Sequence, residues 1–235
     1  MIDAAILTLA LVTGGESTGL FFEQTTIVRQ AGMASGAGVR TRVYCSEKRL
    51  RLEDGDAPDG PALLLRLDEG RIFRLDAESK VAVEIDASRL RSRAQSDAAV
   101  AAGLMGGPEE ELREKPLEGR RTIAGYVCRG FRLTGRSVTV DVWVAEALPV
   151  RADVFADFLE WSGASQALGG LVAAIRRLPG FPLETRMRVG VLGEVQETVS
   201  TVTAVRVGPP PARKFEIPPG WRVVKEQPSP PEVPR

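Results

Sequence analysis

Short runs of alternating apolar and polar residues recur between Leu20 and Asp86, with turn-forming residues between them. A period of two places successive side chains on opposite faces of a β-strand. The connecting segments at 68–70 (Asp-Glu-Gly) and 76–79 (Asp-Ala-Glu-Ser) have the composition of tight hairpin loops. The pattern therefore predicts a meander of adjacent antiparallel strands, which restricts the chain to folds built around a sheet.

Two segments with helical character interrupt the strand pattern. The segment from Ala87 to Met105 is rich in alanine and arginine and is followed by Gly106-Gly107-Pro108, a strong helix stop. The segment from Asp153 to Arg177 has apolar residues at helical spacing, and Gly163 is expected to divide it. Both segments are predicted to be helical. Alternating runs predict further strands at 120–123, 126–133, 138–144, 184–191 and 194–207.

Two of these later strands have one face rich in β-branched residues. In the strand at 138–144, the face consists of Val138, Val140, Val142 and Val144. In the strand at 194–207, it consists of Val195, Val199, Thr201, Thr203, Val205 and Val207. Strict alternation predicts that both faces point toward the interior.

Dense strands on either side of two helical patterns predict an α+β fold dominated by a strongly curved antiparallel sheet. The 235 residues, 43% of them hydrophobic, suit one domain with a sizeable core. We expect residues 19–225 to form this domain. Residues 226–235 contain four prolines among Glu, Gln and Ser, and this composition predicts a disordered tail.

The first 18 residues form an apolar, signal-like segment. The run from Ile6 to Gly15 has the length and apolarity of a signal-peptide core, although Asp3 stands where a basic residue is expected. An export signal and an apolar first element packed on the domain are both consistent with this run. It is too short for a transmembrane helix, which needs about 20 apolar residues.

Composition excludes several kinds of function. The chain has 31 basic and 31 acidic residues, so no net charge favours binding to nucleic acid. It contains no histidine, which removes histidine-based triads and imidazole general bases. Ser162 and Ser165 lack the Gly-x-Ser-x-Gly context of a hydrolase nucleophile, and no glycine-rich loop follows a strand. We therefore predict a protein that is not an enzyme and uses no cofactor or metal.

The two cysteines, Cys45 and Cys128, leave two alternatives open. An exported chain would allow a disulfide between them. Strand phase instead places Cys45 on the apolar face with Val43, whereas Cys128 alternates with Val127 and Phe131 and points the other way. A bulge at Gly130 would reverse that phase.

Several motifs occur in an order and spacing that resemble a bacterial domain family of unknown function within the LolA/LolB-like lipoprotein-carrier superfamily. The resemblance covers most of residues 20–225. The motifs are Arg66–Asp76 (RLDEGRIFRLD), Ile123–Cys128 (IAGYVC), Val142–Pro149 (VWVAEALP), Gly180–Leu183 (GFPL) and Phe215–Pro218 (FEIP).

The resemblance implies a half-barrel of antiparallel strands with helices across its concave face, enclosing an apolar cavity that holds acyl chains in some members. It also implies a periplasmic or cell-envelope location, in agreement with the signal-like first residues. A cavity of this kind would be bounded by the apolar face of the sheet and by the helix stripe above it. The candidate ligand-binding residues are Val140, Val142, Phe155, Phe158, Leu159 and Val199.

Two functions follow from this reading. The first is a non-catalytic envelope protein that binds a hydrophobic or lipid-like ligand, or the acyl chains of a lipoprotein, in the cavity. The alternative is a filled half-barrel that acts as a structural or sensor module and binds another envelope protein. An apolar cavity of at least about 300 Å³ below the helix at 153–177 would favour the first function, and native-density packing there would favour the second.

Two aromatic positions outside the candidate cavity also carry expectations. Trp143 alternates with the valines, so we expect it to lie outside the cavity and to pack against a helix. Pro218 and Pro219 cannot donate ladder hydrogen bonds, so the segment from Phe215 to Trp221 should leave the sheet. Its aromatic residues are expected to anchor it against the end of the domain.

Overall fold

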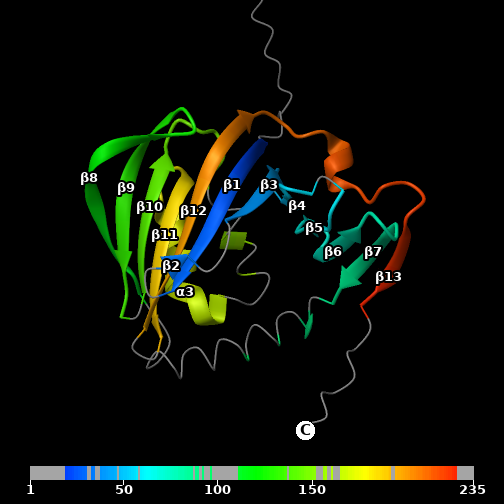
Figure 1. Ribbon diagram of the computed structural model, residues 1–235, viewed down its shortest axis with the longest axis horizontal. Coiled ribbons are helices and arrows are strands. Elements are labelled where there is room, and N and C mark those ends of the chain that lie inside the picture. Colours follow the sequence, from blue (N-terminus) through cyan, green and yellow to red (C-terminus); the bar gives the residue numbers. More distant parts are fainter. Residues whose placement is uncertain are drawn as a thin grey trace, which may run out of the picture.

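The computed structural model describes residues 19–30, 33–34, 38–46, 48–57, 59–86, 88–89, 92, 96, 111–136, 138–151, 156–157, 160, 165–191 and 194–226. These residues form a 13-stranded open sheet and one α-helix with described bounds, α3 (Ser165–Arg177) (Figure 1). The strands are β1 (Leu20–Gln30), β2 (Met33–Ala34), β3 (Val39–Cys45), β4 (Arg49–Asp54), β5 (Ala62–Arg66), β6 (Arg71–Asp76), β7 (Val81–Ile85), β8 (Arg113–Ile123), β9 (Tyr126–Thr134), β10 (Val138–Ala145), β11 (Phe181–Val191), β12 (Glu194–Val207) and β13 (Arg222–Lys225).

The sheet consists of two meanders joined by one long-range pairing. Its strand order is β13-β7-β6-β5-β4-β3-β1-β12-β11-β10-β9-β8, with β2 paired to β1. Every pairing is antiparallel except that of β13 with β7. The β1–β12 register runs from Leu20 opposite Val207 to Gln30 opposite Gln196, and it joins the two meanders into one sheet.

The predicted antiparallel sheet is confirmed, and the sheet is open rather than closed. The half-barrel curvature, the helices across a concave face and the domain boundaries stay predictions. Of the first predicted helix, Ser88, Arg89, Ser92 and Ser96 are described, and all four are helical. No helix in the described part of the chain is long and apolar enough to cross a bilayer.

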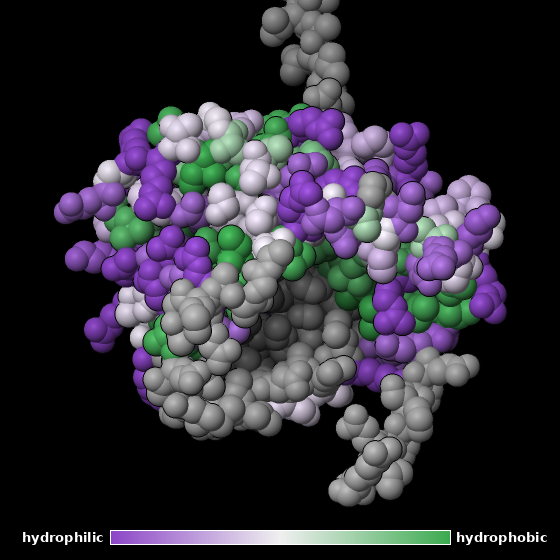
Figure 2. All heavy atoms as spheres, viewed as in Figure 1, coloured by the Kyte–Doolittle hydropathy of each residue, from purple (hydrophilic) through white to green (hydrophobic). Residues whose placement is uncertain are grey.

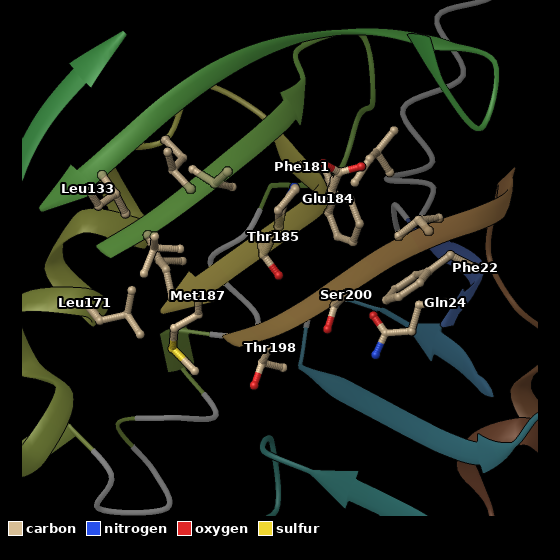
Figure 3. Close-up of a pocket in the computed structure, with 17 residues that line it drawn as sticks. Phe22, Gln24, Leu133, Leu171, Phe181, Glu184, Thr185, Met187, Thr198 and Ser200 are labelled. Atoms are coloured by element: carbon tan, nitrogen blue, oxygen red, sulfur yellow. The ribbon is translucent and has the colours of Figure 1, made fainter. Parts of the chain in front are cut away.

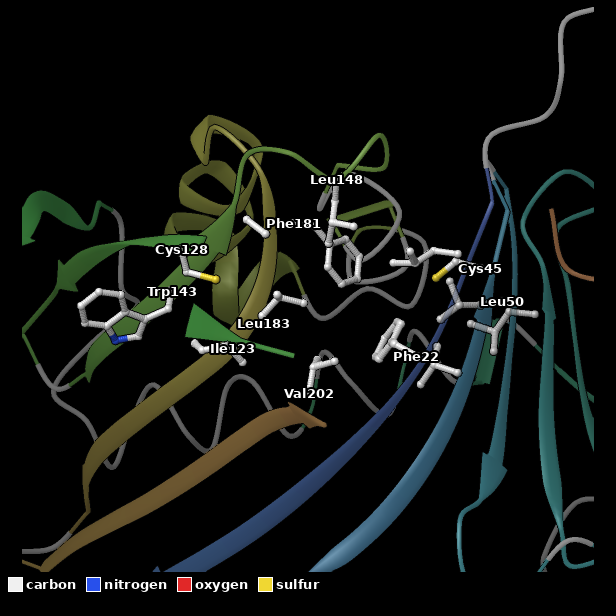
Figure 4. Packing of buried hydrophobic residues seen from close by; sticks show 14 of the residues in the cluster. Phe22, Cys45, Leu50, Ile123, Cys128, Trp143, Leu148, Phe181, Leu183 and Val202 are labelled. Atoms are coloured by element: carbon white, nitrogen blue, oxygen red, sulfur yellow. The ribbon is translucent and has the colours of Figure 1, made fainter. Parts of the chain in front are cut away.

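Apolar side chains pack into three clusters along the sheet. The largest extends from Leu20 and Cys45 to Phe181 and Leu183, and Phe22 meets Phe181 edge to face at 5.4 Å between ring centroids (Figure 4). A second cluster joins β9 and β10 to α3 through residues such as Val142. The third lies on β5–β7 around Phe73. Because Leu64 and Leu65 are both fully buried in different clusters, both faces of β5 are covered.

The closing segment behaves as predicted. After β12 the chain forms a short 3-10 helix, η1 (Ala212–Phe215), and leaves the sheet before it returns as β13. Phe215 is 4% exposed and packs in the third cluster, with Ile217 and Trp221 partly buried against it. The backbone carbonyl of Phe215 accepts a hydrogen bond from Arg66 Nε at 3.0 Å. This segment covers one face of β5–β7.

Candidate ligand-binding cavity

A cavity of about 350 Å³ lies between the sheet and α3. Strands β1, β9, β10, β11 and β12 supply one wall, and Leu171, Ile175 and Leu178 from α3 and the residue after it supply the other (Figure 3). Most of the lining is apolar. In Figure 2, hydrophobic residues lie along the upper and right edges of a hollow on this face of the molecule. The volume falls within the range of about 300–1,000 Å³ that is usual for small-molecule sites.

Helix α3 is held over the cavity by packing on one side and by ion pairs on another. Ala174 and Leu178 are buried against the valines of β10. Arg176 Nη2 lies 2.7 Å from a carboxylate oxygen of Asp157 and 2.7 Å from one of Glu160, two helical residues before α3. These contacts tie α3 to the segment that precedes it.

The structure places three of the six predicted site residues. Val140 and Val142 line the cavity from β10 and are 6% and 2% exposed. Phe155, Phe158 and Leu159 lie outside the described residues. The helix wall that is described comes instead from the next apolar stripe along the same segment, at Leu171 and Ile175.

The prediction for Val199 requires a correction. Thr198 and Ser200 line the cavity, so strand alternation places Val199 on the opposite face of β12. That opposite face carries Glu197, which forms ion pairs with Arg29 and Arg188.

A β-bulge explains why strict alternation failed along β12. Glu23 pairs with Ala204 and Gln24 with Val202, so Thr203 is the extra residue. The insertion reverses the phase of β12. On one side of the bulge Val205 faces the core, and on the other side Val202 faces it. Val195, at the far end, is 53% exposed.

Polar side chains interrupt the apolar lining in one place. The residues are Gln24 on β1, Thr185 on β11, and Thr198 and Ser200 on β12 (Figure 3). Register places Ser200 directly opposite both Thr26 and Thr185. The hydroxyls of Thr26 and Ser200 lie 2.9 Å apart and form a hydrogen bond. The sequence prediction did not include these residues.

The opposite face of the same strands carries a network of ion pairs. Arg132 donates two hydrogen bonds to Asp141, at 2.6 and 2.8 Å, and Arg188 Nε lies 2.9 Å from Glu197. The hydrogen bonds from Arg132 lower the pKa of Asp141. These contacts run across β9–β12, and they identify this face as the solvated one.

Trp143 lies outside the cavity lining, as predicted, and among the described residues it packs on the sheet. A Cβ atom at Gly130 on β9 would lie 2.9 Å from Cη2 and Cζ3 of the indole, so the ring rests directly on this glycine. The guanidinium of Arg121 lies 4.3 Å from the ring centroid. The side chain is 6% exposed, which corresponds to a packing role.

Both cysteines are free thiols buried in the largest cluster. The register of β9 with β10 has no bulge at Gly130, so Cys128 lies on the face of β9 opposite Phe131, as strand phase predicted. That face is buried at Cys128, whereas Val127 is 55% exposed. Burial raises the pKa of the Cys45 thiol to about 12 and also raises that of Cys128. Within the described residues, no group of three or more His, Cys, Asp or Glu could hold a metal ion.

Comparison with known proteins gives a partial family match. Residues 108–221, slightly less than half of the chain, match the model of a domain of unknown function (DUF4412). No curated protein matches the chain.

Solved structures are similar only at a distance. PNGF-II is 14% identical with a TM-score of 0.41, and the match covers 89% of this chain but only 31% of PNGF-II. An uncharacterised conserved protein from Thermus thermophilus is 13% identical with a TM-score of 0.44, covering 89% and 91% of the two chains. A domain assigned to outer membrane lipoprotein sorting in Vibrio parahaemolyticus is 11% identical with a TM-score of 0.31, covering 83% and 88%. None of these similarities is close enough to assign a function.

Proposed function

We propose that this protein is a non-catalytic binder of a hydrophobic or lipid-like ligand, whose hydrocarbon chain occupies the cavity between β9–β12 and α3. The observation that carries the proposal is the cavity itself. It measures about 350 Å³ and has valine, leucine and phenylalanine walls from two layers of the structure. Burial of a hydrocarbon chain there is favourable by about 0.8 kcal/mol per CH₂ group.

The size of the cavity bears on both functions considered from the sequence. A filled half-barrel that only docks another protein would be packed to native density at this position. The space below Leu171 and Ile175 supports the ligand-binding function instead. The volume is near the lower end of the range for ligand sites, which suits one hydrocarbon chain better than a whole diacyl lipid. We place this binder in the cell envelope on the basis of the signal-like first residues.

The neutral dye N-phenylnaphthylamine, which brightens in apolar surroundings, tests the proposal. We expect the purified protein to bind it saturably at one site. Thr198→Phe puts an aromatic ring into the cavity and should weaken dye binding by about tenfold or more, since it removes much of the buried apolar contact. Val199→Phe adds the same ring on the opposite face of the same strand and should leave binding unchanged.

If Thr198→Phe and Val199→Phe change the saturable dye fluorescence equally, the dye binds outside the cavity. That result, or the absence of binding in the parent protein, would contradict the proposed function. Circular dichroism and the unfolding midpoint of each variant should be measured first, so that both variants are compared as folded proteins.

A further inference from the structure

The polar residues of the cavity form a compact patch on three neighbouring strands. Thr185 and Ser200 are directly opposite each other on β11 and β12, and Gln24 comes from β1 on the other side of β12. In Figure 3 these three side chains follow one another across the sheet, while Leu133, Leu171 and Met187 gather on the α3 side. The cavity therefore has an apolar end and a polar patch.

The polar patch is uncharged. Glu184 is the one ionisable residue among the described lining residues, and its carboxylate points away from the patch. It accepts a hydrogen bond from Arg121 at 2.8 Å and lines a separate groove beside Trp143. No arginine or lysine is found among the described lining residues. An ionised ligand group would meet no opposite charge here.

Part of the patch retains hydrogen-bonding capacity. Ser200 shares a hydrogen bond with Thr26. The side chains of Gln24, Thr185 and Thr198 form no hydrogen bond to another described residue, and all three are half-buried. Hydroxyl and amide groups both donate and accept, so they complement a neutral carbonyl or hydroxyl. They cannot offset the cost of removing a carboxylate from water, which is far larger than that of removing a neutral group.

We propose that the cavity selects acyl chains whose polar end is uncharged, such as an ester or an amide, over ionised fatty acids. This inference rests on the proposed function, because it names the ligand class of the same cavity. The acyl chain occupies the apolar end. A carbonyl of the neutral head accepts hydrogen bonds from Thr185 and its neighbours in the patch. A hydroxyl of the head can donate hydrogen bonds to them as well.

Competition between two ligands with the same chain tests the selection. Glycerol monolaurate and laurate are titrated below their micelle concentrations against bound N-phenylnaphthylamine. At about pH 8 we expect the monoester to displace the dye at a concentration at least about tenfold lower than laurate, because laurate is ionised there. Lowering the pH toward about 4 protonates laurate and should strengthen its displacement, with no change for the ester.

Variants of the patch test its part in the selection. Thr185→Val keeps the side-chain shape and removes the hydroxyl, so monolaurate affinity should fall by about 3- to 10-fold, as for one lost hydrogen bond. Thr201→Val, on the opposite face of β12, is the matched control and should affect neither ligand.

The outcomes separate the two claims. If laurate and the monoester displace the dye equally at about pH 8 and Thr185→Val changes neither, the selection for neutral heads is wrong and the hydrophobic site stands. If the parent protein fails to bind the dye, the proposed function is wrong and the inference falls with it.

Discussion

Among the described residues, Glu53 is the charged residue that is buried, with 7% of its surface exposed. Its carboxylate lies 2.8 Å from Lys214 Nζ and 2.7 Å from Arg51 Nε. Lys214 also lies 4.3 Å from the ring centroid of Tyr44. Burial alone would raise the pKa of Glu53, but the hydrogen bonds and charges of Lys214 and Arg51 outweigh it and lower the pKa below 4.5. The ion pair that links η1 to β4 is therefore complete while Glu53 is ionised.

This linkage predicts a pH dependence of stability. A carboxyl group whose pKa is lowered by folding stabilises the native state above its unfolded pKa, and that contribution is lost as the pH falls through the folded pKa. At about pH 7, Glu53→Gln should lower the free energy of unfolding by about 1–3 kcal/mol. The difference from the parent should shrink as the pH falls below 4.5. Urea unfolding across this range measures it.

The control for this measurement is Glu114→Gln, an exposed position on β8. It should change the free energy of unfolding by no more than about 0.5 kcal/mol at either pH. A difference between Glu53→Gln and the parent that stayed constant down to about pH 3 would show that the charge of Glu53 contributes nothing.

The contact between Gly130 and Trp143 gives a second prediction at the scale of single residues. A methyl group at Gly130 would lie 2.9 Å from two indole carbons and from Cβ of Leu117. Gly130→Ala should therefore lower the free energy of unfolding by about 1–3 kcal/mol through overpacking. Val127→Ala, at an exposed site on the same strand, should have little effect. Adding Trp143→Leu to Gly130→Ala should recover part of the loss, and additive losses would argue against direct contact.

Among the secondary-structure elements, β12 shows where strand prediction from the sequence succeeds and where it fails. The existence of β12 was predicted, but strict alternation assigned Val199 to the cavity and omitted Thr198 and Ser200. The bulge at Thr203 reverses the phase, and no local residue pattern marks it. A usable signal lay in the neighbouring strand. Arg188 faces Glu197 directly, and this pairing identifies the solvated face of both strands.

The closing segment was better predicted because its constraints are local. Pro218 and Pro219 lack the N–H groups that a sheet ladder needs, and the aromatic residues on either side require burial. Only its partners could not be read from the sequence. Phe215 packs on residues such as Leu64 and Phe73, which lie far earlier in the chain, and Arg66 binds its carbonyl across a separation of 149 positions.

A substitution at Phe215 tests whether the closing segment stabilises the fold or takes part in ligand binding. Phe215→Ala removes a buried aromatic side chain and should lower the free energy of unfolding by about 3 kcal/mol. Because Phe215 is not among the residues that line the cavity, dye affinity of the folded protein should remain that of the parent. Val223→Ala, at a 48% exposed site on β13, is the control. A Phe215→Ala protein that melted like the parent but lost the dye would show that the segment belongs to the binding site.

At the scale of the whole molecule, the pairing of β1 with β12 determines where the cavity lies. It brings Phe22 and Gln24, near the start of the described chain, against Val205 and Val202 near its end. A sequence pattern predicts strands and their turns but not a pairing between strands so far apart in the chain. For this reason Val140 and Val142, on a strand flanked by its sequence neighbours, could be predicted as cavity residues. Gln24, Thr185 and Ser200 could not.

Native mass spectrometry of the protein purified from its source cells shows whether the cavity holds a ligand. The cavity between β9–β12 and α3 predicts a fraction of molecules carrying one bound lipid-like molecule with an acyl chain. The same fraction should be absent from Thr198→Phe and retained in Val199→Phe, which differ only in the face of β12 that receives the ring. Protein that is free of lipid in every preparation, or lipid retained equally by Thr198→Phe, would show that this cavity does not bind a lipid-like ligand.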